Sequence, residues 1–293
     1  MYDIIIIGAG PAGLTSALYA LRANKKVLVL ESKTYGGQIV NANLIENYPG
    51  ISNISGFDYA TNLYNQVVSL NGEVKYETAI KIEKNKVITN KSEYDCKAII
   101  IATGSTNKKL NIEKEDYFIG KGVSYCATCD GNFYKNKIVA VIGGGNTALE
   151  DAIYLSNIAS KVYLIHRRES FRGEVKYQEE LKNKDNVEYI LNRNVVKLNG
   201  NDKLESIDLD NGDNIKVDGI FIAIGQSPNN EIFKDIIDID NSGYIISNDG
   251  VHTSQLGIYV AGDARVKDLR QLTTAVSDGA IAATTAIREM EEL

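Results

Sequence analysis

Two stretches of the chain share one order of elements: an apolar run, a turn rich in glycine, a helical pattern and a second apolar run. Each apolar run is five or six residues long, which is typical of a strand buried in a parallel sheet. The strand–helix–strand triplets are Tyr2–Ile7, Leu14–Ala23 and Lys26–Leu30, followed later by Ile138–Ile142, Ala148–Asn157 and Lys161–Ile165. The pattern predicts an α/β protein with two Rossmann-like, three-layer domains, each built on a parallel sheet between helices.

Further apolar runs predict the strands that complete these domains. Cys96–Ala102 and Gly219–Ile224 each fit a buried strand that ends near a glycine. After about Gly243 the remaining residues are too few for a third core, yet they predict a strand at Gly257–Ala261 and a helix at Thr273–Glu289. This segment must complete one of the two sheets, and the pattern does not decide which.

Composition narrows the class of protein. The length of 293 residues suits two domains, and 44% hydrophobic with 24% charged residues is ordinary for a globular chain. A net charge of −6 argues against nucleic acid or an anionic membrane as the main partner. No apolar stretch approaches the roughly 20 residues that span a bilayer, and no secretory leader precedes the first strand. Three cysteines do not make a disulfide framework, so we expect a cytoplasmic protein. Residues 84–91 and 192–201, rich in lysine and asparagine, are expected to be solvated turns.

Both triplets carry a glycine signature between the first strand and the helix. The first runs from Gly8 to Gly13 as Gly-Ala-Gly-Pro-Ala-Gly, and the second from Gly143 to Ala148 as Gly-Gly-Gly-Asn-Thr-Ala. Glycines allow a tight turn and a close approach of the backbone to a pyrophosphate, while the helix N-terminus offers unpaired N–H groups. One such signature is weak evidence, but two copies in full context predict two dinucleotide sites in one chain.

The two sites differ at the end of the second strand. Counting 23 residues from the first glycine leads to Glu31 in the first copy and to His166 in the second. Glu31 suits hydrogen bonds from ribose hydroxyls, which favours the adenosine of FAD or NAD. His166 is followed by Arg167 and Arg168, with Arg172 close behind, and guanidinium groups bind a 2′-phosphate through paired hydrogen bonds. The second site is therefore predicted to bind NADPH; the alternative is that the basic run is a solvated loop.

A pair of cysteines, Cys126 and Cys129, lies shortly before the second glycine signature. A zinc site would need further ligands, and the remaining cysteine and the two histidines are scattered. A structural disulfide over so short a loop would add little stability. A redox-active pair fits best, because C-x-x-C thiols exchange readily. Asp130 is a candidate proton donor to a leaving thiolate, with capping of the next turn as the alternative. Cys96, at the start of a buried strand, is expected to be a small core residue.

Together these motifs resemble the low-molecular-weight, bacterial-type thioredoxin reductases of the class II pyridine nucleotide-disulfide oxidoreductase family, over essentially the whole chain. Besides the glycine signatures, the cysteine pair and the arginine cluster, the matching segments are 36–38 (Gly-Gly-Gln), 46–50 (Glu-Asn-Tyr-Pro-Gly), 102–104 (Ala-Thr-Gly), 225–229 (Gly-Gln-Ser-Pro-Asn), 262–263 (Gly-Asp) and 270–271 (Arg-Gln). Leu272 departs from the alanine that is common in the family, so the flavin contact there is expected to differ in detail.

The resemblance implies FAD in a discontinuous domain of residues 1–114 and 245–293, and NADPH in a domain of residues 115–244 that also carries the redox disulfide. The residues it assigns to FAD are Gly8, Gly10, Pro11, Ala12, Gly13, Glu31, Gly37, Gln38, Asn47, Ala102, Thr103, Gly104, Gly262, Asp263, Arg270, Gln271 and Leu272. Those it assigns to NADPH are Gly143, Gly145, Asn146, Thr147, His166, Arg167, Arg168, Arg172, Ile224 and Gly225. Asp263 would hold the ribityl chain. The resemblance also implies a homodimer and a thioredoxin-like protein as substrate.

The resemblance further implies a path for electrons from NADPH to flavin, then to the Cys126–Cys129 disulfide, and finally to thioredoxin. Because the dithiol and NADPH share one domain, that domain would rotate about two short connections, near 111–121 and 240–246, to give each access to the flavin. Cys129, beside Asp130, is predicted to face the flavin. One alternative is a related reductase that exchanges electrons with ferredoxin, and another is a non-catalytic flavin redox sensor. A peroxiredoxin-reducing relative would carry an additional N-terminal disulfide domain.

Overall fold

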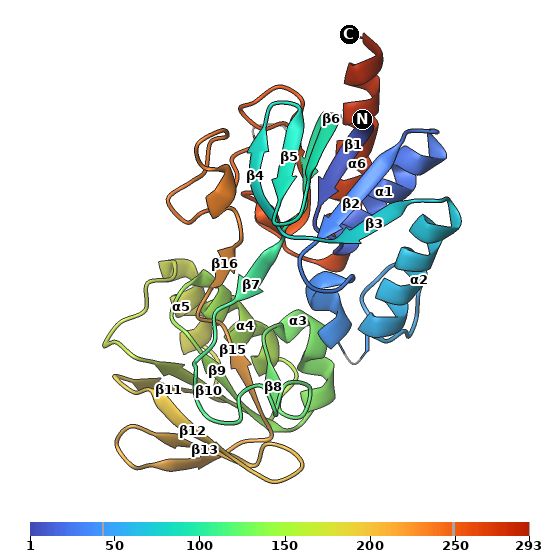
Figure 1. Cartoon of the computed structure of the whole chain (residues 1–293). Helices are drawn as coiled ribbons and strands as arrows, with labels where there is room; N and C mark the ends of the chain where they lie inside the picture. The colour runs from blue at the N-terminus through green and yellow to red at the C-terminus, as the bar shows by residue number, and fades with distance from the viewer. Residues whose placement is uncertain (43, 248–249, 293) are drawn as a thin grey trace. The chain divides into compact units, whose positions relative to one another are not determined.

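The structure is a computed structural model that describes residues 1–42, 44–247 and 250–292 (Figure 1). Two compact units divide the chain: unit 1 comprises Met1–Thr106 and Ser227–Leu293, and unit 2 comprises Asn107–Gln226. Unit 1 is discontinuous, and the chain crosses between the units at 106/107 and 226/227, whereas the sequence led to an expectation of 114/115 and 244/245. The two crossing segments pair with each other as strands β7 (Ser105–Asn107) and β16 (Gln226–Pro228).

Unit 1 is built on a seven-stranded sheet in the order β3-β2-β1-β6-β5-β4, with β17 also paired to β6. Its strands are β1 (Tyr2–Ile7), β2 (Val27–Glu31), β3 (Glu73–Tyr76), β4 (Ala79–Glu83), β5 (Lys86–Thr89), β6 (Glu93–Ile101) and β17 (Ile258–Val260). Strand β17 runs parallel to β6, with Val260 opposite Ile101. The C-terminal segment therefore completes the first sheet, which the sequence pattern alone had left open.

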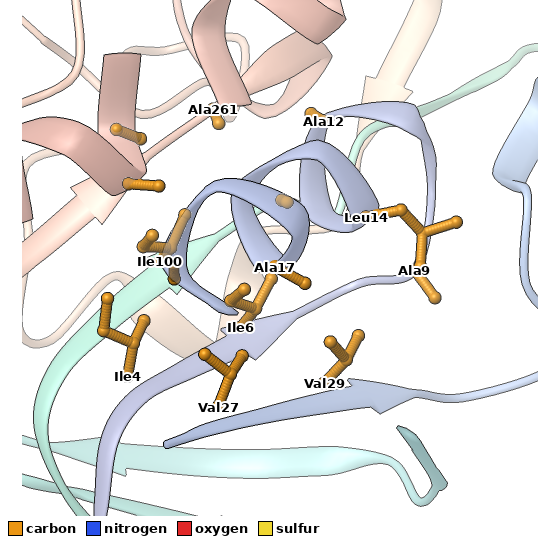
Figure 2. Packing of buried hydrophobic residues seen from close by; sticks show 14 of the residues in the cluster. Ile4, Ile6, Ala9, Ala12, Leu14, Ala17, Val27, Val29, Ile100 and Ala261 are labelled. Atoms are coloured by element: carbon orange, nitrogen blue, oxygen red, sulfur yellow. The ribbon is translucent and has the colours of Figure 1, made fainter. Parts of the chain in front are cut away.

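Both faces of this sheet are covered, and this explains the unbroken aliphatic runs in its central strands. Alternate residues of β1 belong to two separate cores: Ile4 and Ile6 to the first, Ile5 and Ile7 to the second. The helices that cover the first core are α1 (Pro11–Arg22), α2 (Gly56–Ser69) and α6 (Leu272–Glu292). Figure 2 shows the side chains of this core between α1 and the strands beneath it.

The second core is closed partly by the segment that follows the second crossing. Phe233, in the short 3-10 helix η3 (Glu231–Phe233), is buried together with Ile237 and Ile245 against Ile82 of β4. Because these side chains complete the core of unit 1, residues 227–246 belong to unit 1. The second crossing therefore comes before this segment and not after it.

Unit 2 contains a five-stranded parallel sheet in the order β11-β10-β9-β15-β8. Its strands are β8 (Val123–Ser124), β9 (Ile138–Ile142), β10 (Lys161–His166), β11 (Val187–Leu191) and β15 (Gly219–Ile222), and its helices are α3 (Ala127–Asp130), η2 (Gly131–Tyr134), α4 (Asn146–Ser156) and α5 (Val175–Lys182). A separate antiparallel sheet consists of β12 (Val195–Asn199), β13 (Ser206–Leu209) and β14 (Asn214–Lys216). The predicted α/β class with two Rossmann-like domains is confirmed. None of the described helices is long and apolar enough to cross a membrane.

Two stretches that were expected to be solvated turns contain strands instead. Strand β5 buries Val87 and Thr89, and strand β12 buries Val195 and Leu198. In β5 the buried residues alternate with more exposed ones, which is the period of a strand with one face inward. The alternation is short and lies among lysines and asparagines, so the sequence did not indicate a strand there.

Candidate functional site

The first glycine turn joins β1 to α1, and two of its glycines are required by close packing. Gly8 has φ of +111°, and an added Cβ would lie 2.3 Å from the carbonyl oxygen of Ala102 at the end of β6. A Cβ on Gly13 would lie 1.9 Å from the oxygen of Gly8. Gly10 is different, because the nearest atom to its Cβ position is Gly37 Cα at 3.9 Å. The middle glycine therefore leaves room over the backbone where a pyrophosphate would lie.

The second glycine turn, between β9 and α4, repeats this geometry. Gly143 has φ of +157°, and its added Cβ would lie 2.4 Å from the oxygen of Ala223. Beyond its own chain neighbours and helix backbone, no atom of the described residues lies within 4 Å of the Cβ position at Gly145. Neither α1 nor α4 is capped by a side chain at its N-terminus, where Gly10 and Gly145 are the N-cap residues. Both turns thus present backbone N–H groups and open space to an anion.

Gly145→Ala is expected to weaken NADPH binding by about tenfold or more while leaving the apoprotein stable. A methyl group fits at this position in the protein alone, but it would stand where the pyrophosphate must approach the backbone. Thermal unfolding of the apoprotein and titration with NADPH measure the two effects. Gly143→Ala is the matched control, because it strains the turn itself and should lower the unfolding temperature. Unchanged NADPH affinity in Gly145→Ala would contradict the assignment.

Other residues assigned to FAD also lie in unit 1, and several contact the first turn. Glu31, at the end of β2, accepts hydrogen bonds from the backbone N–H groups of Ala9 and Lys33, each at 2.9 Å. Gln38 of the 3-10 helix η1 (Gly37–Asn41) donates to the backbone oxygen of Ser105, next to Gly104. Two further contacts involve assigned residues: Thr103 Oγ1 donates to Asn230 Oδ1 at 2.9 Å, and Asn47 Nδ2 donates to Gln271 Oε1 at 3.2 Å.

Two buried polar atoms in this region have no hydrogen-bond partner among the described residues: Asp263 Oδ1 and Arg270 Nε. Asp263 lies in the 3-10 helix η4 (Gly262–Ala264), and burial raises the pKa of its carboxyl. The guanidinium of Arg270 lies over the ring of Tyr244, with its Cζ 4.2 Å from the ring centroid. Gly262 in turn contacts the first helix, since its added Cβ would lie 2.8 Å from Ala12 Cβ. A ligand with hydroxyl and anionic groups, as FAD has, fits this set of donors and acceptors.

His166 and the arginines lie beside the second turn. His166 is only 4% exposed, its ring packs on Gly144, and its Nε2 has no hydrogen-bond partner among the described residues. Burial, followed by the charges of Arg172, Arg168 and Arg167, lowers the pKa of His166, so the ring is neutral at neutral pH. The backbone N–H of Arg172 donates to Gly144 O at 2.7 Å, which ties the cluster to the turn.

The three arginine side chains are exposed, and within the described ranges their guanidinium groups form no hydrogen bond or ion pair. Three unpaired cations next to an anion-binding turn suit a phosphorylated ribose. The Asn146 side chain has a structural role, because it forms two hydrogen bonds of 2.8 Å with Glu174. Thr147 and Ile224 lie at the surface, while Gly225, with φ of +106°, follows β15.

The cysteine pair lies where β8 meets α3. Cys126 and Cys129 are joined as a disulfide with their Cα atoms 5.3 Å apart, and both are partly exposed. The backbone N–H of Cys129 donates to Cys126 Sγ at 3.2 Å, so the first sulfur lies at the N-terminus of the short helix. The Ser124 hydroxyl donates to Asp130 Oδ2 at 2.7 Å and accepts from the N–H of Cys126 at 3.1 Å. Burial raises the pKa of Asp130, and the hydrogen bond from Ser124 partly opposes that shift.

Sequence analysis did not identify Ser124, which links the acid to the first cysteine. Its position two residues before Cys126 was visible, but its contact with Asp130 depends on the turn of α3. Cys96, the remaining cysteine, is a buried core residue as predicted, and burial raises its pKa to about 12. Among the described residues, no group of acidic, histidine or cysteine side chains is arranged to bind a metal ion.

A second residue that the sequence did not reveal is Asp151 on α4. This helix packs against α3, and Tyr154 and Leu155 contact Gly131 directly after the disulfide helix. Asp151 lies one helical turn before Leu155, and burial, assisted by the charge of Glu150, raises its pKa to about 7. A carboxyl group with this pKa changes charge near neutral pH.

Asp151→Asn is expected to stabilise the protein at pH 8 and to have little effect at pH 4. The folded state holds the Asp151 proton up to about pH 7, whereas the unfolded chain releases it near 3.8, so stability falls as pH rises between these values. The raised pKa lowers the free energy of unfolding by about 2 to 4 kcal/mol above pH 7. The asparagine substitution removes this loss. Denaturant midpoints at both pH values measure it. Asp202→Asn, at an exposed position of unit 2, is the control, and an equal effect of Asp151→Asn at both pH values would refute the prediction.

Comparison with known proteins adds to this geometry. A family model described as pyridine nucleotide-disulphide oxidoreductase matches residues 2–279. The thioredoxin reductase of Mycoplasma genitalium is 44% identical over 293 residues, which cover 96% of this chain and 93% of that protein. The crystal structure of thioredoxin reductase from Streptococcus pyogenes aligns with a TM-score of 0.95 at 40% identity, covering 100% and 99% of the two chains. A ferredoxin-flavin thioredoxin reductase from Clostridium acetobutylicum aligns at 29% identity with a TM-score of 0.54, covering 100% and 99%.

Proposed function

Because the chain belongs to the pyridine nucleotide-disulphide oxidoreductase family, we propose that it is a thioredoxin reductase that oxidises NADPH and contains FAD. The family resemblance inferred from the motifs is confirmed. The observation that carries the proposal is the joined Cys126–Cys129 pair beside Asp130, in the unit whose glycine turn is flanked by three unpaired arginines. In this reaction the electron donor carries a 2′-phosphate, and the electrons pass to a reducible disulfide.

The residues of unit 1 fit FAD and those of unit 2 fit NADPH. The first glycine turn would hold the FAD pyrophosphate, Glu31 the adenosine ribose, and Asp263 a hydroxyl of the ribityl chain. The second turn would hold the NADPH pyrophosphate, with Arg167 and Arg168 on the 2′-phosphate. When bound, FAD supplies two-electron transfer between a nicotinamide and a disulfide.

The cysteine pair performs the disulfide exchange. Two electrons and two protons convert the Cys126–Cys129 disulfide into two thiols. One thiolate attacks a sulfur of oxidised thioredoxin, forms a mixed disulfide and displaces one thioredoxin thiolate. The second cysteine then attacks the mixed disulfide, which restores the intramolecular bond and releases reduced thioredoxin. Asp130, whose pKa burial raises, is the candidate proton donor to the thiolate that leaves.

The proposal includes features that rest on the family resemblance. They are a homodimer, a cytoplasmic location, Cys129 as the sulfur that faces the flavin, and rotation of the NADPH domain about two short connections near 111–121 and 240–246. Each of them stays a prediction.

The principal alternative is electron supply by ferredoxin, as the name of the Clostridium acetobutylicum relative indicates for that protein. The unpaired arginines beside the second turn favour NADPH, because a reductase that uses ferredoxin needs no 2′-phosphate site. A flavin redox sensor without turnover is a further alternative, and the partly exposed disulfide argues for exchange with another protein.

The deciding experiment follows the flavin and the substrate together. The FAD-loaded protein is expected to lose its visible flavin absorbance when NADPH is added without oxygen, and to reduce a bacterial thioredoxin in a coupled assay. NADH should act at least about 100-fold less well. Bleaching by reduced ferredoxin alone would support the ferredoxin alternative. Bleaching by NADPH without thioredoxin reduction would support the sensor.

A further inference from the structure

Asp278, on α6, is a buried carboxylate that no sequence motif identified. It is 6% exposed and accepts four hydrogen bonds. The backbone N–H of Gly262 donates to Oδ2 at 3.0 Å, and Lys267 Nζ donates to the same oxygen at 2.8 Å. Arg265 binds both oxygens, with Nε 2.9 Å from Oδ2 and its terminal nitrogen 3.0 Å from Oδ1. A single side chain thus connects α6, two cations and the turn that carries Asp263.

The next residue of α6, Gly279, packs closely against α1. An added Cβ on Gly279 would lie 2.3 Å from Ala12 O, and the Gly279 oxygen accepts a 3.0 Å hydrogen bond from the Ser16 hydroxyl. Asp278 and Gly279 therefore hold the Gly262 turn and the first turn of α1 from adjacent positions on one helix. Both turns belong to the region proposed to bind FAD.

Lys267 forms an ion pair with Asp278, while Asp263, four residues earlier in the chain, forms no hydrogen bond or ion pair with it among the described residues. Its charge lowers the pKa of Asp263 against the larger effect of burial, so the two side chains are electrostatic neighbours. Its hydrogen bond, however, goes to Asp278, and its side chain is only 6% exposed. Asp263 Oδ1 is left buried with no hydrogen-bond partner in the described part of the chain.

We propose that Asp278 is a positioning residue of the flavin site: it holds Lys267 away from Asp263, which keeps Asp263 Oδ1 open to a ligand hydroxyl, and it fixes the Gly262 turn. This inference rests on the proposed binding of FAD in unit 1. Without the charge at 278, Lys267 would pair with Asp263, the carboxylate four residues before it whose pKa its charge already lowers, and would compete with the ligand for it.

The test is a cycle of variants in which FAD binding to the apoprotein is followed by flavin fluorescence. Asp278→Asn keeps an acceptor for the Gly262 N–H but loses the charge, and it should raise the FAD Kd by about tenfold. Lys267→Met alone should stay within about threefold of wild type, because the Lys267 ammonium is paired with Asp278 and not with Asp263. The double variant Asp278→Asn/Lys267→Met should recover to within about threefold of Lys267→Met. Asp268→Asn, at an exposed carboxylate of the same loop, is the control and should bind FAD normally.

A role limited to packing predicts a different result, because removing Lys267 could not restore binding. The proposal is overturned if Asp278→Asn binds FAD like wild type, or if the double variant is as weak as Asp278→Asn. It is also overturned if Lys267→Met alone loses tenfold, a result that does not depend on whether Asp278→Asn folds. If the wild-type apoprotein does not bind FAD, the proposed function fails, and this outcome is distinct from a failure of the positioning role.

Discussion

Replacing Cys126 with serine is expected to reduce NADPH-driven reduction of thioredoxin by more than about 1,000-fold, the largest effect predicted for this chain. A serine hydroxyl can neither form the disulfide with Cys129 nor attack the disulfide of a substrate. The nucleotide sites do not involve this sulfur, so NADPH should still bleach the flavin at a rate close to that of wild type. Stopped-flow absorbance and the coupled thioredoxin assay separate the two steps.

Cys129→Ser should give the same loss of thioredoxin reduction, because both sulfurs are needed. The matched control is Cys96→Ala, which removes a buried cysteine of unit 1 whose pKa of about 12 excludes thiolate chemistry. That variant should keep its activity. If thioredoxin reduction survives in Cys126→Ser, the proposed disulfide step is wrong.

The double variant Arg167→Ala/Arg168→Ala is expected to lower kcat/KM for NADPH by about 100-fold and to leave the value for NADH nearly unchanged. Hydrogen bonds from guanidinium groups to a phosphate contribute about 1.5 to 3 kcal/mol each, and NADH lacks the 2′-phosphate that receives them. Because both side chains are exposed and form no hydrogen bond or ion pair within the described ranges, their loss should not destabilise unit 2.

Steady-state kinetics with both nucleotides, at one ionic strength, measures this change of preference. Lys216→Ala is the control, since it removes an exposed cation from β14, in the separate antiparallel sheet. This variant should leave kcat/KM unchanged for both NADPH and NADH. A double arginine variant that still prefers NADPH as strongly as wild type would refute the phosphate assignment.

The candidate site was predictable wherever its residues are close in the sequence to a recognisable strand. Gly8 and Gly143 follow apolar strands directly, so their turns and the helices after them were located before the fold was known. Glu31 and His166 lie at the ends of the second strands, and a count from the glycines found them. The joined cysteines needed only their own spacing.

Residues whose role depends on distant contacts were missed. Ser124 matters because it donates a hydrogen bond to Asp130. Asp151 matters because its face of α4 is buried. Asp278 matters because it accepts hydrogen bonds from Gly262 and Lys267. The sequence around Asp278 shows only a charged residue inside an alanine-rich helix. Its importance comes from β17 and α6 together, and only the fold brings them to one place.

By itself the sequence determined the two parallel-sheet units, the two glycine turns, the difference between an acid and an arginine cluster, and the redox pair. These are local patterns, in which a strand period, a turn or a short spacing already fixes the chemistry. The tertiary structure alone decided that the C-terminal strand joins β6, that Phe233 and Ile237 complete the core of unit 1, and that the crossings fall at 106/107 and 226/227. Such choices depend on which apolar surfaces remain uncovered once both sheets have formed, and that is a property of the folded chain, not of any segment.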